Sequence, residues 1–217
     1  MISMQHVYKT YLKIWPALKD INVTISKGDF VFLTGPSGAG KSTFLKLIYC
    51  EERPSRGDLF LFGEKVGRIS HHKRALIRQR IGVVFQDFKL IIHKTAYENL
   101  ALASNVVGLM PSLAHRRILE VVNQMKLSHK LHVPVYQLSG GEQQRIAIAR
   151  ALVTSPDIIL ADEPTGNLDP AIADSIMEVL KQLNAQGATI IMATHNYALI
   201  ERYPFKKIHI AGGTISG

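Results

Sequence analysis

The sequence has little of what would mark a secreted, membrane-spanning or disordered protein. It contains one cysteine, Cys50, so a single chain can form neither a disulfide framework nor a cysteine-built zinc site, which favours a reducing compartment. Its longest apolar runs are far shorter than the roughly 20 residues of a membrane-spanning helix. Polar side chains recur through the first twenty residues, so no secretory signal is expected there. A chain of 217 residues that is 47% hydrophobic is instead expected to form one compact unit.

Acidic residues are scarce relative to basic ones. The chain has 26 Lys+Arg against 17 Asp+Glu, a formal net charge of +9. This excess predicts an anionic partner, which could be nucleic acid, an acidic membrane surface or a phosphorylated small molecule. The range 65–80 is basic without any acidic or aromatic residue, and its cations are Lys65, Arg68, Lys73, Arg74, Arg78 and Arg80. Because nucleic-acid grooves usually interleave aromatic residues with basic ones, we interpret this range as a solvated helix face, with a membrane-facing surface as the alternative.

Short apolar runs rich in β-branched residues predict buried parallel strands, because helical patterns separate them along the chain. These runs are residues 30–33, 81–85, 158–161 and 189–193. Alternating stretches before Gly28 and at residues 59–62 predict an antiparallel β flank, and Gly212-Gly213 predicts a hairpin. The pattern predicts an α/β fold with a parallel core sheet.

Two ranges, 113–126 and 171–186, carry apolar residues with the period of a helix. Ser112 is expected to cap the first helix, and Asp169 followed by Pro170 is expected to begin the second. The whole stretch 87–156 has helical patterns and no clear strand. We therefore predict a single domain with a catalytic α/β core, residues 1–86 and 157–217, and an inserted helical subdomain, residues 87–156.

A glycine-rich loop follows the first predicted core strand. Residues 35–42 match the P-loop pattern G-x-x-x-x-G-K-[ST] between a strand and a helix. Glycines let backbone N–H groups wrap a phosphate chain, and the next helix points its positive end at the same place. Lys41 adds a cation and Ser42 a hydroxyl for Mg²⁺. The predicted nucleotide-binding residues are Gly35, Pro36, Ser37, Gly38, Ala39, Gly40, Lys41, Ser42 and Thr43.

Two adjacent carboxylates, Asp162 and Glu163, end the predicted strand 158–161. Beside a P-loop, an apolar strand that ends in Asp has the form of a Walker B element, whose carboxylate reaches Mg²⁺ directly or through water. Glu163 is then placed to act on the attacking water. Two carboxylates that merely end a strand in solvent are the alternative, but their pairing with a P-loop favours hydrolysis of the nucleotide over binding alone.

A further glycine-containing string, Leu-Ser-Gly-Gly-Glu-Gln-Gln-Arg, occupies residues 138–145. Ser139 and Glu142 have the spacing of a capping box, so the string by itself fits a capped helix without a ligand. Together with the P-loop and the carboxylate pair, it resembles the signature motif of the ABC ATPases. The chain resembles this family over almost its whole length, which implies a P-loop NTPase fold with a RecA-like parallel core and ATP hydrolysis with Mg²⁺.

The resemblance also implies roles for particular residues. Tyr11 stands where an aromatic residue stacks on adenine, Gln86 matches the Q-loop glutamine, and His195 matches the switch histidine that senses the γ-phosphate. Each is weak alone, because a lone Tyr or His is more often structural and Asp169, in the D-loop match 167–169, already caps a helix. The implied catalytic residues are Lys41, Gln86, Glu163 and His195, and the implied metal ligands are Ser42, Gln86 and Asp162.

In this family two ATP molecules lie between two domains arranged head to tail. The P-loop of one copy then faces the helix end of the other, formed by Ser139, Gly140, Gly141 and Glu142. The family implies a homodimer on ATP binding, and each chain alone holds only half-sites.

The family further implies an integral membrane partner and a place in the cytoplasm, peripheral on the inner face of the cell membrane. Residues 84–90 and 95–100 resemble the branch that acts in bacterial cell division, while residues 160–169 are shared with lipoprotein-release and efflux branches, which stay as alternatives. Asn196 and residues 91–93 depart from the commonest pattern. A soluble nucleic-acid-linked ABC ATPase is a weaker alternative, because this length fits one ATPase domain, and no nucleic acid is expected as a partner.

Overall fold

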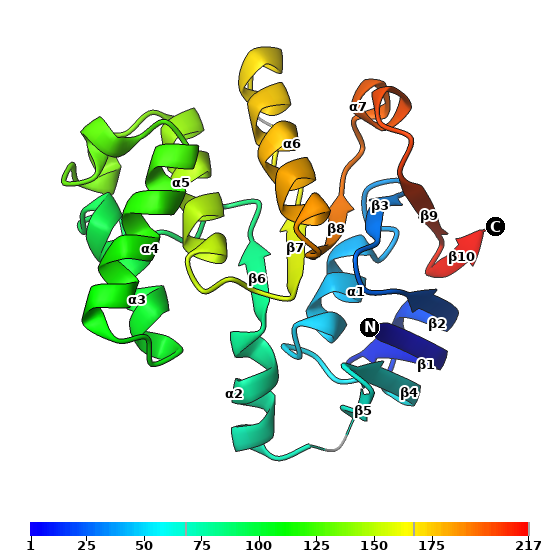
Figure 1. Ribbon diagram of the computed structural model, residues 1–217. Coiled ribbons are helices and arrows are strands. Elements are labelled where there is room, and N and C mark those ends of the chain that lie inside the picture. The colour runs from blue at the N-terminus through cyan, green and yellow to red at the C-terminus, as the bar shows by residue number, and fades with distance from the viewer. Residues whose placement is uncertain (68, 167, 217) are drawn as a thin grey trace.

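The structure, a computed structural model, describes residues 1–67, 69–166 and 168–216. Its main sheet has the strand order β10-β9-β3-β8-β7-β6, and every pairing except β9 with β10 is parallel (Figure 1). The strands are β3 (Phe30–Thr34), β6 (Ile81–Val84), β7 (Ile158–Asp162), β8 (Thr189–Ala193), β9 (Lys206–Ala211) and β10 (Thr214–Ser216). The predicted parallel core is confirmed, and the predicted hairpin at Gly212-Gly213 joins β9 to β10. Both faces of β3 and β8 are buried, which is why they read as unbroken apolar runs.

The predicted antiparallel flank is confirmed, but it forms a sheet of its own, with the order β2-β1-β4-β5. Its strands are β1 (Ile2–Tyr11), β2 (Trp15–Ile25), β4 (Arg56–Leu61) and β5 (Glu64–Lys65). One backbone hydrogen bond, from Lys19 N to Gly213 O at 2.7 Å, ties it to the end of the main sheet. Apolar side chains of helix α1 fill the space between the two sheets.

The helices are α1 (Lys41–Ile48), α2 (His71–Gln79), α3 (Ala96–Val106), α4 (Pro111–Gln124), α5 (Gly140–Leu152), α6 (Pro170–Ala185) and α7 (Tyr197–Arg202). The prediction that Ser112 caps a helix is wrong. Helix α4 begins at Pro111, with Met110 in the cap position. Proline favours the first helical position because it has no N–H to satisfy there, so the helix starts earlier than its apolar stripe. Asp169 does cap α6, since its Oδ1 accepts a hydrogen bond from Ile172 N at 3.0 Å.

Residues 87–156, all of which the structure describes, contain α3, α4, α5 and the short 3-10 turns η1 (Ser128–Lys130) and η2 (Val135–Gln137), without a strand. Figure 1 shows these green helices to one side of the main sheet. Side chains of α5, including Ile146, Ile148 and Leu152, belong to the same apolar cluster as Phe32 and Val84 of the sheet. The inserted helical subdomain therefore stays a prediction, since its core is continuous with that of the sheet.

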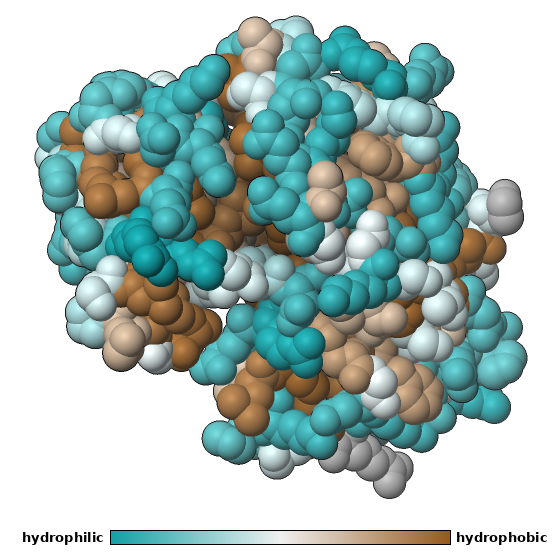
Figure 2. Space-filling view, viewed as in Figure 1, coloured by the Kyte–Doolittle hydropathy of each residue, from teal (hydrophilic) through white to brown (hydrophobic). Residues whose placement is uncertain are grey.

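An apolar surface patch covers the end of α3 and the turn that follows it, at the lower left of Figure 2. Val106, with 72% of its surface exposed, and Met110 are its large side chains. Most of the remaining surface in this view is hydrophilic.

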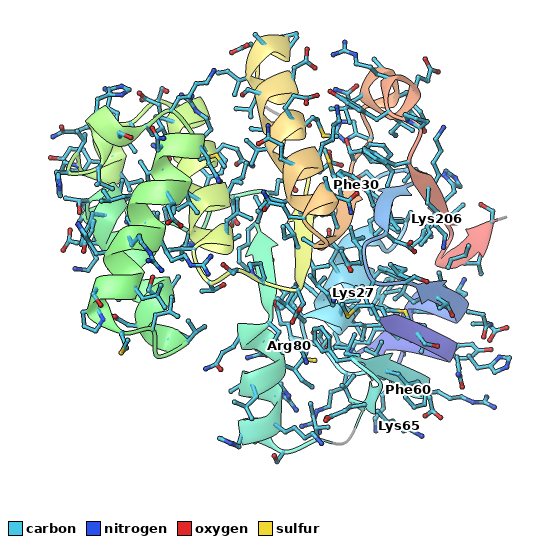
Figure 3. All side chains as sticks on the ribbon, viewed as in Figure 1. Lys27, Phe30, Phe60, Lys65, Arg80 and Lys206 are labelled. Atoms are coloured by element: carbon cyan, nitrogen blue, oxygen red, sulfur yellow. The ribbon has the colours of Figure 1, made fainter. Side chains whose placement is uncertain are left out.

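The basic range 65–80 lies on and around α2, which buries only Ile77 and so fits the predicted solvated face. Several of its cations are paired within the chain. Lys65 and Arg80, both labelled in Figure 3, bind Asp58 at 2.6 Å and Asp157 at 2.7 Å. Lys73 binds Glu64 at 2.8 Å, and Arg78 donates to the carbonyls of residues 49 and 50 at the end of α1. Arg68 lies outside the described residues. Internal pairing leaves less of this charge for a polyanion or an acidic membrane than the sequence suggests.

Candidate functional site

The carboxyl ends of four parallel strands meet at one cleft. The P-loop follows β3, Asp162 ends β7, and Gln86 and His195 come two residues after β6 and β8. Loops that leave this edge of a parallel sheet commonly form binding sites, because all the strands release them in the same direction. The cleft has a volume of about 450 Å³ and is lined by Ala17, Ser37, Gly38, Gly40, Lys41, Ser42, Thr43, Gln86, Asp162, Glu163 and His195.

At the first and last glycines of the P-loop, the backbone conformation and the close neighbours exclude any other residue type. Gly35 has a φ of 137°, and a Cβ placed there would lie 2.0 Å from Ile210 O. Gly40 has a φ of 111°, and its Cβ would lie 2.6 Å from Ala17 O. Backbone carbonyls of β9 and β2 thus lie against the two ends of the loop and leave no room there for a side chain. Gly40 is also the N-cap of α1 and has no side chain to cover the first N–H groups, so these groups can bind an anion.

Lys41 curls back over the loop that precedes it. Its side chain is buried, and its Nζ donates hydrogen bonds to Gly35 O at 2.8 Å and Pro36 O at 3.0 Å. The ammonium group is therefore held inside the curve of the loop, where it adds a positive charge to the N–H groups of the helix end.

Asp162 and Ser42 bring oxygen ligands to the same wall of the cleft. Burial raises the pKa of the Asp162 carboxyl, Glu163 adds to that shift, and a hydrogen bond from Ser42 and the charge of Lys41 oppose it. No group of three His, Cys, Asp or Glu side chains among the described residues could hold a metal alone. A carboxylate, a hydroxyl and the Gln86 amide oxygen suit Mg²⁺, which takes its other ligands from water and substrate phosphates.

Glu163 and His195 form a pair across the ends of β7 and β8. His195 Nδ1 lies 2.7 Å from Glu163 Oε1, and the Glu163 N–H donates to Ala193 O at 2.9 Å. Because an ionised carboxylate only accepts hydrogen bonds, Nδ1 carries the proton in this arrangement. The Nε2 edge of the ring is left for another partner.

The Q-loop that follows Gln86 is anchored by Arg150 at the far end of α5. The Arg150 guanidinium donates to Phe88 O at 2.7 Å and to Lys89 O. Phe88 and Lys89 have φ values of 60° and 51°, a conformation that needs external support in residues other than glycine. Sequence reasoning missed Arg150, because nothing in a regular helical pattern shows which distant carbonyls one arginine will reach.

Three of the predicted ATP-contacting elements do not line this cleft. Tyr11 ends β1, with its ring centroid 4.9 Å from Lys9 Nζ. Ser139 caps α5 through a capping box: Glu142 N donates to Ser139 Oγ at 3.3 Å, and Ser139 N to Glu142 Oε2 at 2.8 Å. The backbone bond from Ser139 lowers the pKa of Glu142. Asp169 caps α6, while Asn167 lies outside the described residues. Within one chain, P-loop residues and the carboxylates after β7 line the cleft, and residues 139–142 do not.

A model of the ABC transporter family matches residues 18–166. The chain belongs to the ABC transporter family. This ABC domain is 46% identical over 99% of its length to the cell division ATP-binding protein FtsE of Bacillus subtilis (strain 168), 94% of which is covered. It is 44% identical, with the same coverage of 99% and 94%, to FtsE of Streptococcus pneumoniae serotype 2.

Solved structures agree with this assignment. A dimeric ATP-binding cassette in a post-hydrolysis state, bound to ADP and Pi, matches with a TM-score of 0.92 at 37% identity and covers 100% of this chain and 97% of that one. The family resemblance and the fold predicted from the sequence are both confirmed. The chain is an ATP-hydrolysing ABC domain. Among the described residues, no helix is both long enough and apolar enough to cross a bilayer.

Proposed function

We propose that this ABC domain is the ATP-hydrolysing subunit of a membrane complex that acts in cell division. In this role it is peripheral on the cytoplasmic face of the membrane, drives an integral membrane partner resembling FtsX, and so regulates cell-wall hydrolysis. Similarity to FtsE proteins over 99% of the chain carries the proposal. A lipoprotein-release or efflux subunit resembling LolD or MacB is the second candidate, because residues 160–169 are shared with those branches.

The cleft supports a specific division of work in ATP hydrolysis. The P-loop N–H groups and Lys41 bind and orient the phosphates, while Ser42, Asp162 and Gln86 would hold Mg²⁺, which would neutralise phosphate charge. Glu163 accepts a hydrogen bond from the attacking water and orients it toward the γ-phosphate. His195 fixes Glu163 through Nδ1 and presents its other ring edge to that phosphate.

The separation of Ser139 from the cleft supports a head-to-tail homodimer. In such a dimer the N-terminal end of α5 in one copy covers the nucleotide held by the P-loop of the other. Ser139, Gly140, Gly141, Glu142 and Asp169 then contact the partner's ATP, and Tyr11 stacks on adenine in its own copy. The solved cassette that resembles this chain at a TM-score of 0.92 is described as dimeric, which favours the same arrangement here.

A second hollow, of about 650 Å³, is suited to the membrane partner. It lies between α2, β6, the end of α3 and the end of α5, next to the Q-loop. Apolar side chains line much of it, among them Val83, Phe85 and Val106, and Val106 also belongs to the exposed apolar patch of Figure 2. Arg150 lines this hollow and holds the Q-loop, so a segment seated here would lie against the loop that carries Gln86.

Purification of the tagged chain from detergent-solubilised membranes tests this proposal. We expect an integral membrane protein to co-purify with the wild-type chain and with Leu119→Glu, a control on the exposed side of α4 outside the hollow. Val106→Glu should lose that partner, because it places a charge on the apolar patch, yet keep the ATPase rate of the isolated chain.

The identity of the captured protein separates the two candidates. A division protein resembling FtsX supports the proposal, whereas a lipoprotein-release or efflux permease supports the second candidate. Equal capture by Val106→Glu and the wild-type chain would contradict the assignment of the hollow.

A further inference from the structure

Helix α5 touches three parts of the ATPase machinery. Ser139 caps its N-terminal end, Gln144 in its second turn contacts the loop after β7, and Arg150 near its C-terminal end holds the Q-loop. A short, well-capped helix moves as one piece, so a displacement at its N-terminal end is passed to the other two contacts.

The middle contact is a single hydrogen bond. Gln144, only 2% exposed, donates from Nε2 to Pro164 O at 2.7 Å. Pro164 directly follows Glu163, so this bond holds the backbone one residue after the carboxylate proposed to orient water. The backbone of Glu163 has a φ of 50°, which a non-glycine residue adopts only where its surroundings hold it. Gln144 is part of that support, together with the Glu163 N–H bond to Ala193 O.

Two buried polar side-chain atoms at this contact have no hydrogen-bond partner among the described residues. They are Gln144 Oε1 and Thr165 Oγ1. Leaving a buried polar atom unpaired costs free energy, so such atoms are uncommon in folded proteins and call for a physical explanation. A hydroxyl can donate and an amide oxygen can accept, so a shift of α5 along the loop that brought Thr165 to Gln144 would satisfy both atoms at once.

We propose that Gln144 is a positioning residue that makes the placement of Glu163 depend on the position of α5. The inference rests on the proposed head-to-tail dimer and on the proposed role of Glu163. In that dimer the triphosphate of ATP in the partner's cleft contacts Ser139, so ATP binding there moves α5 and with it Glu163 in this chain's own cleft. Gln144 and Thr165 thereby couple the two ATP sites.

The test measures steady-state ATP hydrolysis against ATP concentration, together with ATP affinity and melting temperature. Gln144→Met keeps the side-chain volume and removes the amide. Gln143→Met is the matched control, because the Gln143 amide donates to Val135 O and Leu138 O, away from Glu163. We expect Gln144→Met to lower kcat by about tenfold or more and to reduce the Hill coefficient toward unity, while ATP affinity changes by less than about twofold. Gln143→Met should keep the wild-type kcat and Hill coefficient.

A second variant covers the case in which Gln144→Met does not fold. Thr165→Val removes only the unpaired hydroxyl, so we expect an unchanged or higher melting temperature together with a lower Hill coefficient. A purely structural role for these residues would not separate stability from cooperativity in this way.

Glu163→Gln, measured in the same assay, distinguishes failure of the coupling role from failure of the proposed function. If Glu163→Gln is inactive but Gln144→Met and Thr165→Val behave like Gln143→Met, the coupling role is wrong and the proposed function stands. A wild-type Hill coefficient of one also overturns the coupling role. If Glu163→Gln hydrolyses ATP at the wild-type rate, both the role of Glu163 and the inference built on it fail.

Discussion

The Nδ1 atom of His195 lies 2.7 Å from the Oε1 atom of Glu163. The two residues come from the ends of adjacent strands, β7 and β8, and differ sharply in exposure. The Glu163 side chain is 11% exposed and that of His195 is 70% exposed. The carboxylate is thus enclosed at the floor of the cleft, and the imidazole forms its outer lip. This arrangement lets a ligand touch the ring while the ring fixes the carboxylate.

We predict that Glu163→Gln lowers steady-state ATP turnover by about 100-fold or more, because the neutral amide keeps the shape but orients and polarises the attacking water far less strongly than a carboxylate. ATP binding should persist, and ATP-bound dimers should accumulate, as size-exclusion chromatography with ATP would show. His195→Ala should also lower turnover, but adding it to Glu163→Gln should cost little more, since the two side chains act as a unit. Unchanged hydrolysis by Glu163→Gln would remove this residue from the catalytic role.

We predict that Gly35→Ala destabilises the chain by more than about 2 kcal/mol and abolishes nucleotide binding. Its Cβ would meet the backbone carbonyl of Ile210 at 2.0 Å, and β9 cannot retreat without breaking its pairing with β3. Urea denaturation and binding of a fluorescent ATP analogue measure the two effects. Gly67→Ala is the control, because a Cβ there meets nothing within 4 Å. Equal stability of the two variants would show that the loop is not held against β9.

The capping box of α3 predicts a pH dependence of stability. The Thr95 backbone N–H, the Lys94 ammonium and the Thr95 hydroxyl lower the pKa of Glu98 from 4.5 to about 2. A carboxyl whose pKa is lower in the folded state stabilises the fold fully above its unfolded pKa, and this contribution is lost as the pH falls toward the folded pKa.

The wild-type chain should therefore be more stable than Glu98→Gln at neutral pH, and the difference should shrink between about pH 5 and pH 2. Urea midpoints of both proteins across this range check the prediction. A difference that stays constant with pH would show that the charge of Glu98 does not contribute to the cap.

Local features of this protein could be predicted from its sequence, and long-range contacts could not. Patterns of consecutive residues predict the core strands and the P-loop, and Asp169-Pro170 indicates the start of α6 directly. The apolar stripe does not predict the start of α4 at Pro111, because a stripe and a helix boundary need not coincide. The contacts of Gln144 with Pro164 and of Arg150 with the Q-loop join residues 20 and 62 positions apart, and a single sequence carries no signal for such pairs.

The free charge of the range 65–80 also cannot be predicted from the sequence. Its partners Asp58 and Asp157 come from other strands and loops, so the range reads as a bare basic segment although much of it is paired in the fold. The local composition of this range therefore overstates the charge that it offers to a polyanionic partner. Lys41, another of the basic residues, lies at the cleft with its Nζ hydrogen-bonded to Gly35 O and Pro36 O.

Mixing two inactive variants tests the central claim, a composite ATP site shared between two copies, most directly. Lys41→Ala damages the P-loop half and Ser139→Arg damages the opposite half. In a head-to-tail dimer the mixed pair has one damaged site and one intact site, so random pairing restores up to about one quarter of the wild-type ATPase rate. The double variant Lys41→Ala/Ser139→Arg, added to the wild-type chain, should inactivate both sites of every mixed dimer. Wild-type activity of Ser139→Arg alone, or wild-type chains unaffected by the double variant while mixed dimers form, would contradict the account.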